Sequence, residues 1–113
     1  MWKEWIQKIN KTWKRGMEEK DISWEELKQK EKEGAMVVDT RSPQEYQEGH
    51  IEGAISLPEY EIKQKAEKQF PNKQEIIIVY CSTGHRSKKA QQELEQMGYE
   101  KIYNLAGGIE NIK

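Results

Sequence analysis

The chain alternates between short apolar runs and amphipathic stretches, and this pattern predicts strands that alternate with helices. Four segments are predicted to be strands: residues 35–38 (ending at Asp39), residues 54–57, Ile76–Tyr80 and Lys101–Leu105. The unbroken apolar character of Ile76–Tyr80 is typical of a central parallel strand that is covered on both faces. Strands that alternate with helices imply a parallel sheet with right-handed crossovers, so the sequence predicts an α/β fold.

Two capping boxes mark the starts of helices. In such a box a serine and a glutamate three residues later each accept a hydrogen bond from the other's backbone N–H. Ser23 pairs with Glu26 in the first box, and Ser42 pairs with Glu45 in the second. The helix that begins after Ser23 is predicted to end near Gly34, which suits a left-handed C-terminal cap.

Two further helices are predicted from composition and spacing. A polar helix is expected over residues 59–70, between two prolines. Ala90, Leu94 and Met97 recur at helical spacing after the only cysteine, and Gly98 is expected to end that helix.

The first twenty residues differ from the rest because they carry one amphipathic helical pattern. Apolar residues recur at steps of three and four on one face: Trp2, Trp5, Ile6, Ile9, Trp13 and Met17. The other face is basic, with Glu4 against five cations: Lys3, Lys8, Lys11, Lys14 and Arg15. The sequence therefore predicts a helical extension over residues 1–20 and a domain over residues 21–113.

Two roles are open for this extension. Its apolar stripe can pack against the domain or against a second copy of the chain, which is the more common use of such a stripe. The alternative is peripheral membrane contact through residues 1–17, because tryptophan and lysine side chains both suit an anionic membrane surface.

Composition limits the classes of function. The 113 residues are enough for one domain, and a single cysteine allows no internal disulfide. A net charge of −1 argues against nucleic acid as a partner, and two histidines with one cysteine are too few for a structural zinc site. No stretch approaches the roughly 18 apolar residues of a membrane span. Charged residues near the N-terminus interrupt the apolar core that a secretory signal would need. A cytoplasmic protein is expected.

The single cysteine, Cys81, directly follows the predicted central strand and precedes a helix. The residues between sulfur and helix can turn their backbone N–H groups toward the sulfur, and Gly84 allows a tight loop. The helix N-terminus and the nearby cations, among them His85, Arg86 and Lys88, add positive potential. Such surroundings lower the pKa of a thiol and make it a nucleophile. The alternative is that Cys81 is a small buried hydrophobe.

Four stretches resemble the single-domain rhodaneses, a family of thiosulfate sulfurtransferases. They are "ISWEEL" at 22–27, "VVDTRSPQEYQEGHIEGAISLP" at 37–58, "IIIVYCSTGHRS" at 76–87 and "NLAGGI" at 104–109. The resemblance implies a central parallel sheet of about five strands flanked by helices. It covers about four-fifths of the chain, and the residue 1–20 extension lies outside it.

The resemblance also implies a ping-pong reaction without metal or organic cofactor. Cys81 would attack the outer sulfur of thiosulfate, which would release sulfite and leave a persulfide on Cys81. A thiol acceptor or cyanide would then take the outer sulfur of that persulfide. The partners would be a small sulfur-containing anion and a thiol acceptor, with a protein persulfide as a further candidate. The residues expected to bind substrate and stabilise the persulfide are Ser82, Thr83, Gly84, His85 and Arg86.

Two rival functions remain open from the sequence. Related phosphatases and arsenate reductases on this fold place five residues between cysteine and arginine, whereas four stand between Cys81 and Arg86. The shorter loop favours sulfur transfer. The other rival is a non-catalytic rhodanese-like binding module, but inactive members usually lack the cysteine that this chain retains.

Asp39 and Arg41 match the family's Asp-x-Arg and are expected to support the site. Asp39 is predicted to accept backbone hydrogen bonds, and Arg41 is predicted to pair with a carboxylate such as Glu45, the alternative being contact with the bound anion. His50 is expected to be buried and hydrogen-bonded rather than a catalytic base. Gly107–Gly108 is expected to form a tight turn beside the cysteine loop.

The role of the N-terminal extension can be tested with lipid vesicles. If the apolar stripe packs on protein, the chains with and without residues 1–20 should be recovered equally in the pellet with anionic vesicles. Sedimentation of the longer chain alone would contradict packing on protein and support membrane contact.

Overall fold

The structure is a computed structural model that describes residues 20–112. The helix predicted over residues 1–20 lies, except for Lys20, outside the described residues, so its docking and its membrane contact stay predictions. Among the helices of the described part, none is long and apolar enough to cross a membrane.

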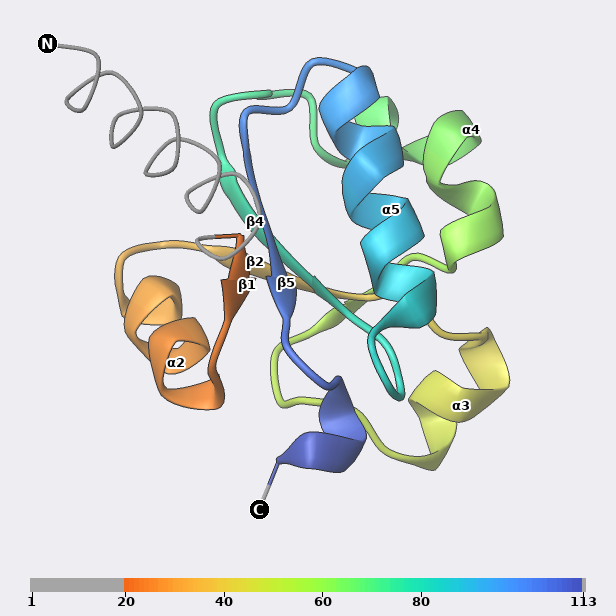
Figure 1. Cartoon of the computed structure of the whole chain (residues 1–113). Coiled ribbons are helices and arrows are strands. Elements are labelled where there is room, and N and C mark those ends of the chain that lie inside the picture. The colour runs from red at the N-terminus through yellow and green to blue at the C-terminus, as the bar shows by residue number, and fades with distance from the viewer. Residues whose placement is uncertain (1–19, 113) are drawn as a thin grey trace, which may run out of the picture.

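Five parallel strands form one sheet at the centre of the described domain (Figure 1). The strands are β1 (Asp21–Ile22), β2 (Met36–Asp39), β3 (Ile55–Ser56), β4 (Ile76–Tyr80) and β5 (Lys101–Leu105). Their order across the sheet is β1-β5-β4-β2-β3, and every neighbouring pair is parallel. The predicted α/β class with about five parallel strands is confirmed.

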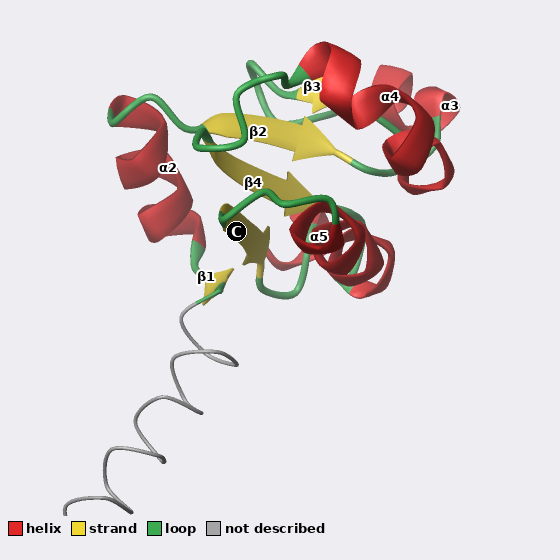
Figure 2. Ribbon diagram, turned by 90° about the horizontal axis from the view of Figure 1, so that it is seen from above, coloured by secondary structure: helices red, strands yellow, loops and turns green. Residues whose placement is uncertain are grey.

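Helices cover both faces of this sheet, with α2 on one side and α4 and α5 on the other (Figure 2). The helices are α2 (Trp24–Lys32), α3 (Pro43–Glu48), α4 (Ile62–Gln69) and α5 (His85–Gln96), with 3₁₀ turns η1 (Glu59–Glu61) and η2 (Ile109–Asn111). The sheet is therefore an inner layer, which explains why its central strand is apolar throughout.

The central strand β4 divides its side chains between two cores. Ile77 and Val79 belong to the cluster that includes residues of α4 and α5, whereas Ile78 and Tyr80 belong to the cluster that includes Leu27 of α2. Residues 77–80 are all fully buried. The alternation follows from the two-residue period of a strand, and it fixes the register that places Cys81 at the strand's end.

Local sequence signals set the helix boundaries as predicted. Both capping boxes are present: Ser23 with Glu26 before α2, and Ser42 with Glu45 before α3. Gly34 has φ of +101° after the last turn of α2. This left-handed conformation is the cap that glycine adopts without strain.

Three elements differ from the sequence-based expectations. The pattern did not reveal β1, because this strand has two residues and only Ile22 is buried. The strand expected over residues 54–57 is reduced to β3 (Ile55–Ser56). The helix expected over residues 59–70 begins as the 3₁₀ turn η1 and becomes α-helical only at Ile62.

The strand order places Cys81 at the switch point of the sheet. From β2 the chain continues outward to β3, whereas β4 continues toward β5 on the other side. Cys81 follows β4, and Asp39 is the last residue of the adjacent β2, with Arg41 two residues further on. The carboxyl edge at such a reversal is where ligands bind in open α/β sheets.

A glycine turn after β5 packs directly on the cysteine loop, as predicted. Gly107 and Gly108 have φ of +76° and +70°. A Cβ on Gly108 would lie 2.3 Å from the carbonyl oxygen of Ser82 and 2.5 Å from that of Cys81. Only glycine therefore allows the two backbones to approach this closely.

Substitution of Gly108 should destabilise the domain more than substitution of another left-handed glycine. Gly34→Ala adds a Cβ with nothing within 4 Å, so it should cost only the conformational strain, about 1–2 kcal/mol. Gly108→Ala should cost a further 1–3 kcal/mol or so, because its Cβ overlaps backbone atoms. Urea unfolding of both variants measures the difference, and equal losses would contradict the close approach.

Candidate active site

The sulfur of Cys81 lies inside a ring of hydrogen-bond donors at the start of α5. The backbone N–H of Gly84 donates to Sγ over 3.0 Å, and the hydroxyl of Ser87 lies 3.4 Å from Sγ. Gly84 has φ of +110° and is the N-cap of α5, so the first turn of the helix points at the sulfur. Of the loop amides that were expected to turn inward, that of Gly84 donates to the sulfur.

These donors outweigh burial in setting the acidity of the thiol. Cys81 is only 1% exposed, and burial by itself raises the pKa of a thiol because it disfavours the charged form. The Ser87 hydroxyl and the amides of Ser87, Gly84 and Thr83 stabilise the thiolate, and the pKa of Cys81 falls below its ordinary value. Cys81 is therefore buried, and yet its thiol ionises more readily than an ordinary cysteine.

The loop carbonyls are turned away from the sulfur. The N–H of Ile109 donates to the carbonyl oxygen of Cys81 over 2.8 Å, and the N–H of Glu110 donates to that of Ser82 over 3.1 Å. Both donors lie in η2, after the Gly107–Gly108 turn. Carbonyl oxygens that would repel a thiolate are thus satisfied on the opposite side of the loop.

The guanidinium of Arg86 is paired with Glu45. Its Nη1 lies 2.7 Å from Oε1 and its Nη2 lies 3.0 Å from Oε2 of the carboxylate. The pair is bidentate, and it holds the pKa of Glu45 well below its usual range. Ser82 joins it, because its hydroxyl lies 3.3 Å from Oε2 of Glu45 and 3.2 Å from Nη2 of Arg86. Anion binding by Arg86 stays a prediction.

The other cations after the loop also have carboxylate partners. Lys88 lies 2.9 Å from both carboxylate oxygens of Asp21, and Lys89 lies 3.0 Å from Glu59. These charges are thus locally compensated. Among the described residues, the groups that stabilise the thiolate of Cys81 are backbone amides and the Ser87 hydroxyl.

Asp39 and Arg41 form a buried ion pair, so Arg41 has a carboxylate partner as expected, although that partner is Asp39 rather than Glu45. Arg41 Nη2 lies 2.7 Å from Asp39 Oδ2 and donates to the carbonyl oxygen of Gly49 over 2.6 Å. The predicted partner of Arg41, Glu45, pairs with Arg86 instead. Asp39 is wholly buried and accepts one backbone hydrogen bond, from the N–H of Arg41. Asp39 and Arg41 are two positions apart in the chain, so the guanidinium can bond directly to the carboxylate.

Tyr80 connects this pair to the cysteine strand. Its hydroxyl donates to Asp39 over 2.8 Å and accepts from the N–H of Ile51 over 3.0 Å. Burial and the nearby Asp39 raise the pKa of Tyr80, so its hydroxyl remains a donor at neutral pH. The last residue before Cys81 is therefore tied to two other segments.

The prediction for His50 is wrong in one respect. The ring is exposed rather than buried, and it stacks on Tyr46 with ring centroids 3.7 Å apart. Its Nδ1 lies 2.7 Å from the Tyr46 carbonyl oxygen, so the expected hydrogen bond is present. Stacking on a neighbouring helix residue satisfies the ring without burial.

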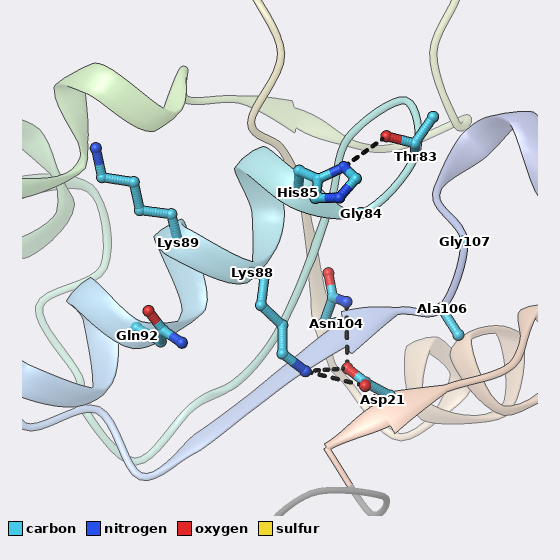
Figure 3. Close-up of a pocket in the computed structure, with 10 residues that line it drawn as sticks. All are labelled: Asp21, Thr83, Gly84, His85, Lys88, Lys89, Gln92, Asn104, Ala106 and Gly107. Carbon is cyan, nitrogen blue, oxygen red and sulfur yellow. Dashed lines mark hydrogen bonds and ion pairs between the residues drawn. The ribbon is translucent and has the colours of Figure 1, made fainter.

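A hollow of about 500 Å³ opens along the flank of the cysteine loop (Figure 3). His85 and Thr83 lie together at one side, with the His85 Nδ1 3.3 Å from the Thr83 hydroxyl oxygen. Lys88 reaches across to Asp21 on the other side. Cys81 is not among the lining residues, so the hollow borders the loop without containing the sulfur.

Ser87, which the sequence did not single out, is the one side chain among the described residues whose hydroxyl lies within hydrogen-bonding distance of the sulfur. Ser87 is fully buried, and its hydroxyl also lies 3.2 Å from the carbonyl oxygen of Gly84. A hydroxyl has one proton for these two acceptors, and a charged sulfur is the stronger acceptor. The available signal was a small polar residue in the first turn of a helix that follows a cysteine.

The chain matches the family model of the rhodanese-like domain over residues 23–113, and it belongs to this family. The described fold and the amide ring around Cys81 agree with that assignment. Several members of the family are named as sulfurtransferases.

Two relatives named as thiosulfate sulfurtransferases are similar to most of the chain. The chain is 39% identical over 75 residues to PspE of Escherichia coli (strain K12), covering 66% of this chain and 71% of that protein. It is 31% identical over 91 residues to GlpE of Coxiella burnetii (strain RSA 331 / Henzerling II), covering 80% of each. A tRNA uridine(34) hydroxylase of Teredinibacter turnerae is 37% identical over 81 residues, but the match covers only 24% of that protein.

Solved structures agree with the family. A structure described as a rhodanese with anions from E. coli aligns with a TM-score of 0.63 and 36% identity, covering 69% of this chain and 91% of that chain. The human single-domain sulfurtransferase TSTD1 aligns with a TM-score of 0.72 and 26% identity, covering 83% and 98%. The described fold is thus that of the rhodanese domain.

Removal of the Ser87 hydroxyl should raise the pKa of Cys81, because the hydroxyl stabilises only the charged form of the thiol. The pH profile of alkylation by iodoacetamide should therefore move to higher pH in Ser87→Ala, with a rate at pH 7 about fivefold lower. Ser82→Ala is the matched control, since that hydroxyl bonds to Glu45 and Arg86 instead. Identical profiles for Ser87→Ala and the original chain would contradict this role.

Proposed function

We propose that the protein is a sulfurtransferase that carries sulfur as a persulfide on Cys81. The observation that supports this most directly is the convergence of the Gly84 amide, the Ser87 hydroxyl and the α5 N-terminus on one sulfur. These groups stabilise negative charge, and both the thiolate and a persulfide anion carry it. The names of the relatives PspE and GlpE point to the same chemistry.

The first half-reaction moves sulfur from donor to enzyme. The Cys81 thiolate attacks the outer sulfur of thiosulfate or a similar donor, and a new sulfur–sulfur bond forms at Sγ. The old sulfur–sulfur bond breaks, and its electron pair leaves with sulfite. The terminal sulfur of the persulfide then carries the negative charge that the loop amides can stabilise.

The second half-reaction returns the enzyme to its thiolate. A thiolate acceptor, or cyanide, attacks the terminal sulfur, and the electron pair of the breaking bond returns to Sγ. The acceptor leaves as a persulfide or as thiocyanate. No oxidant, metal or organic cofactor is needed, because both steps exchange one sulfur–sulfur bond for another bond to sulfur.

The structure bears on the two rival functions. Phosphate is a tetrahedral oxyanion that needs room inside the loop, whereas here four residues separate Cys81 from Arg86 and the Gly84 N–H lies 3.0 Å from Sγ. A phosphatase is therefore disfavoured. A purely non-catalytic module would not need a hydroxyl and several amides directed at a buried thiol.

Mass spectrometry of the intact protein tests the persulfide directly. Incubation with thiosulfate should add the mass of one sulfur atom, and cyanide should remove it and form thiocyanate. Cys81→Ser should show neither change, because a hydroxyl cannot form the persulfide. Circular dichroism checks that this variant is folded. Hydrolysis of p-nitrophenyl phosphate without sulfur transfer would instead support the phosphatase alternative.

A further inference from the structure

The cation nearest the loop in sequence, Arg86, has its charge matched by a fixed carboxylate. Glu45 occupies both terminal nitrogens of the guanidinium, over 2.7 and 3.0 Å. Arg86 holds the pKa of Glu45 well below its usual range, so the carboxylate is ionised at every pH at which the thiol would work. An incoming anion meets a neutral ion pair rather than a free positive charge.

Glu45 is held in place by its own helix. It is the N3 residue of α3, and its Oε1 accepts hydrogen bonds from the N–H of Ser42 over 3.1 Å and from the Ser42 hydroxyl over 3.0 Å. The Ser82 hydroxyl, one residue after Cys81, contacts its other oxygen. Rotation of Glu45 away from Arg86 would break the capping box, so the carboxylate stays beside the loop.

The remaining side-chain cations around the loop give no net positive charge either. Arg41, Lys88 and Lys89 each have a carboxylate partner among the described residues: Asp39, Asp21 and Glu59. The thiolate adds one negative charge to these neutral pairs. Partial charges from the amides and the α5 N-terminus remain to attract a donor, and these are weaker than a full charge.

We infer that Glu45 is a specificity determinant that disfavours doubly charged sulfur donors. Donors that bear one negative charge, such as organic persulfides and thiosulfonates, then react more readily than thiosulfate, which bears two. This inference rests on the proposed function, since it concerns the donor half-reaction at Cys81. Its physical basis is that Glu45 cancels the charge of Arg86, so the repulsion between the Cys81 thiolate and the charge of the donor is not offset.

Two donors of nearly the same size and shape allow the effect of donor charge on reactivity to be measured by itself. Thiosulfate carries two negative charges, and methanethiosulfonate replaces one charged oxygen by a methyl group and carries one. The Cys81 thiolate breaks the same kind of sulfur–sulfur bond in each, and the electron pair leaves with sulfite from the first and with methanesulfinate from the second. Both donors leave the same persulfide on the enzyme.

The test is the ratio of kcat/KM for thiosulfate to kcat/KM for methanethiosulfonate, with cyanide as the common acceptor and thiocyanate as the readout. In a ping-pong reaction kcat/KM for the donor reports only the donor half-reaction. Glu45→Gln removes the charge while the amide oxygen can still cap α3. The uncovered charge of Arg86 should raise the ratio about tenfold, because a dianion gains twice the electrostatic stabilisation of a monoanion.

Glu95→Gln is the matched control. Glu95 is also ion-paired, to Lys20, and its side chain is 31% exposed compared with 30% for Glu45. It lies near the far end of α5, roughly 15 Å along the helix from the loop. This variant should leave the ratio within about twofold of the original.

A rise in the ratio of threefold or more in Glu45→Gln, but not in Glu95→Gln, supports the inference. A smaller rise, or an equal rise in both variants, overturns it while leaving the sulfurtransferase function intact. A protein inactive with both donors would instead overturn the proposed function and this inference together.

If Glu45→Gln does not fold, the salt dependence of the kcat/KM ratio in the original chain tests the same inference. The thiosulfate to methanethiosulfonate ratio should rise with ionic strength, because salt screens the repulsion of the dianion more strongly. A ratio that falls would show that the site attracts the dianion despite Glu45, and a flat ratio would show that there is no net repulsion. Either outcome would overturn the inference.

Discussion

The site depends on a division of the loop backbone into two faces. The carbonyl groups of Cys81 and Ser82 are bound by N–H groups of η2, and the amides that follow are thereby free to face the sulfur. This division requires contact between the loop and the turn after β5. The contact is possible because residue 108 is glycine, since a Cβ there would overlap the carbonyl groups of Cys81 and Ser82. The nucleophile's environment is thus set by backbone hydrogen bonds between two strand ends, more than by any single side chain.

Electrostatic compensation is the second organising feature. Arg41, Arg86, Lys88 and Lys89 lie close to the cysteine edge of the sheet, yet each is paired with a carboxylate. A thiol in such surroundings is acidified by short-range dipoles, which act on Sγ without creating a broad positive field. The groups that lower the pKa of the thiol are therefore hydrogen-bond donors at short range, while the side-chain cations are held in ion pairs.

Much of the fold could be predicted from the sequence because its signals are local. The capping boxes, the left-handed Gly34 and the apolar Ile76–Tyr80 strand depend on residues within one turn or one run. Strand β1 could not be predicted, because its two residues are ordered by pairing with β5. Its place in the sheet follows from distant partners and from no hydrophobic pattern of its own.

The candidate site divides in the same way. Cys81 and Gly84 were found from the strand, the loop and the glycine between them. The partners of the arginines were not, since the Glu45–Arg86 pair joins residues 41 positions apart and competes with the nearer Arg41. Ser87 was missed because the direction of its hydroxyl depends on how the first turn of α5 meets the sulfur.

The burial of Cys81 has a consequence for the proposed sulfur transfer. Cys81 is only 1% exposed, so bulky oxidants and large thiols contact the loop before they reach Sγ. A bound sulfane atom extends the side chain by about 2 Å, the length of one sulfur–sulfur bond. In the proposed reaction an acceptor would therefore need to reach an atom about 2 Å beyond Sγ, and it would not need to reach the buried Sγ itself.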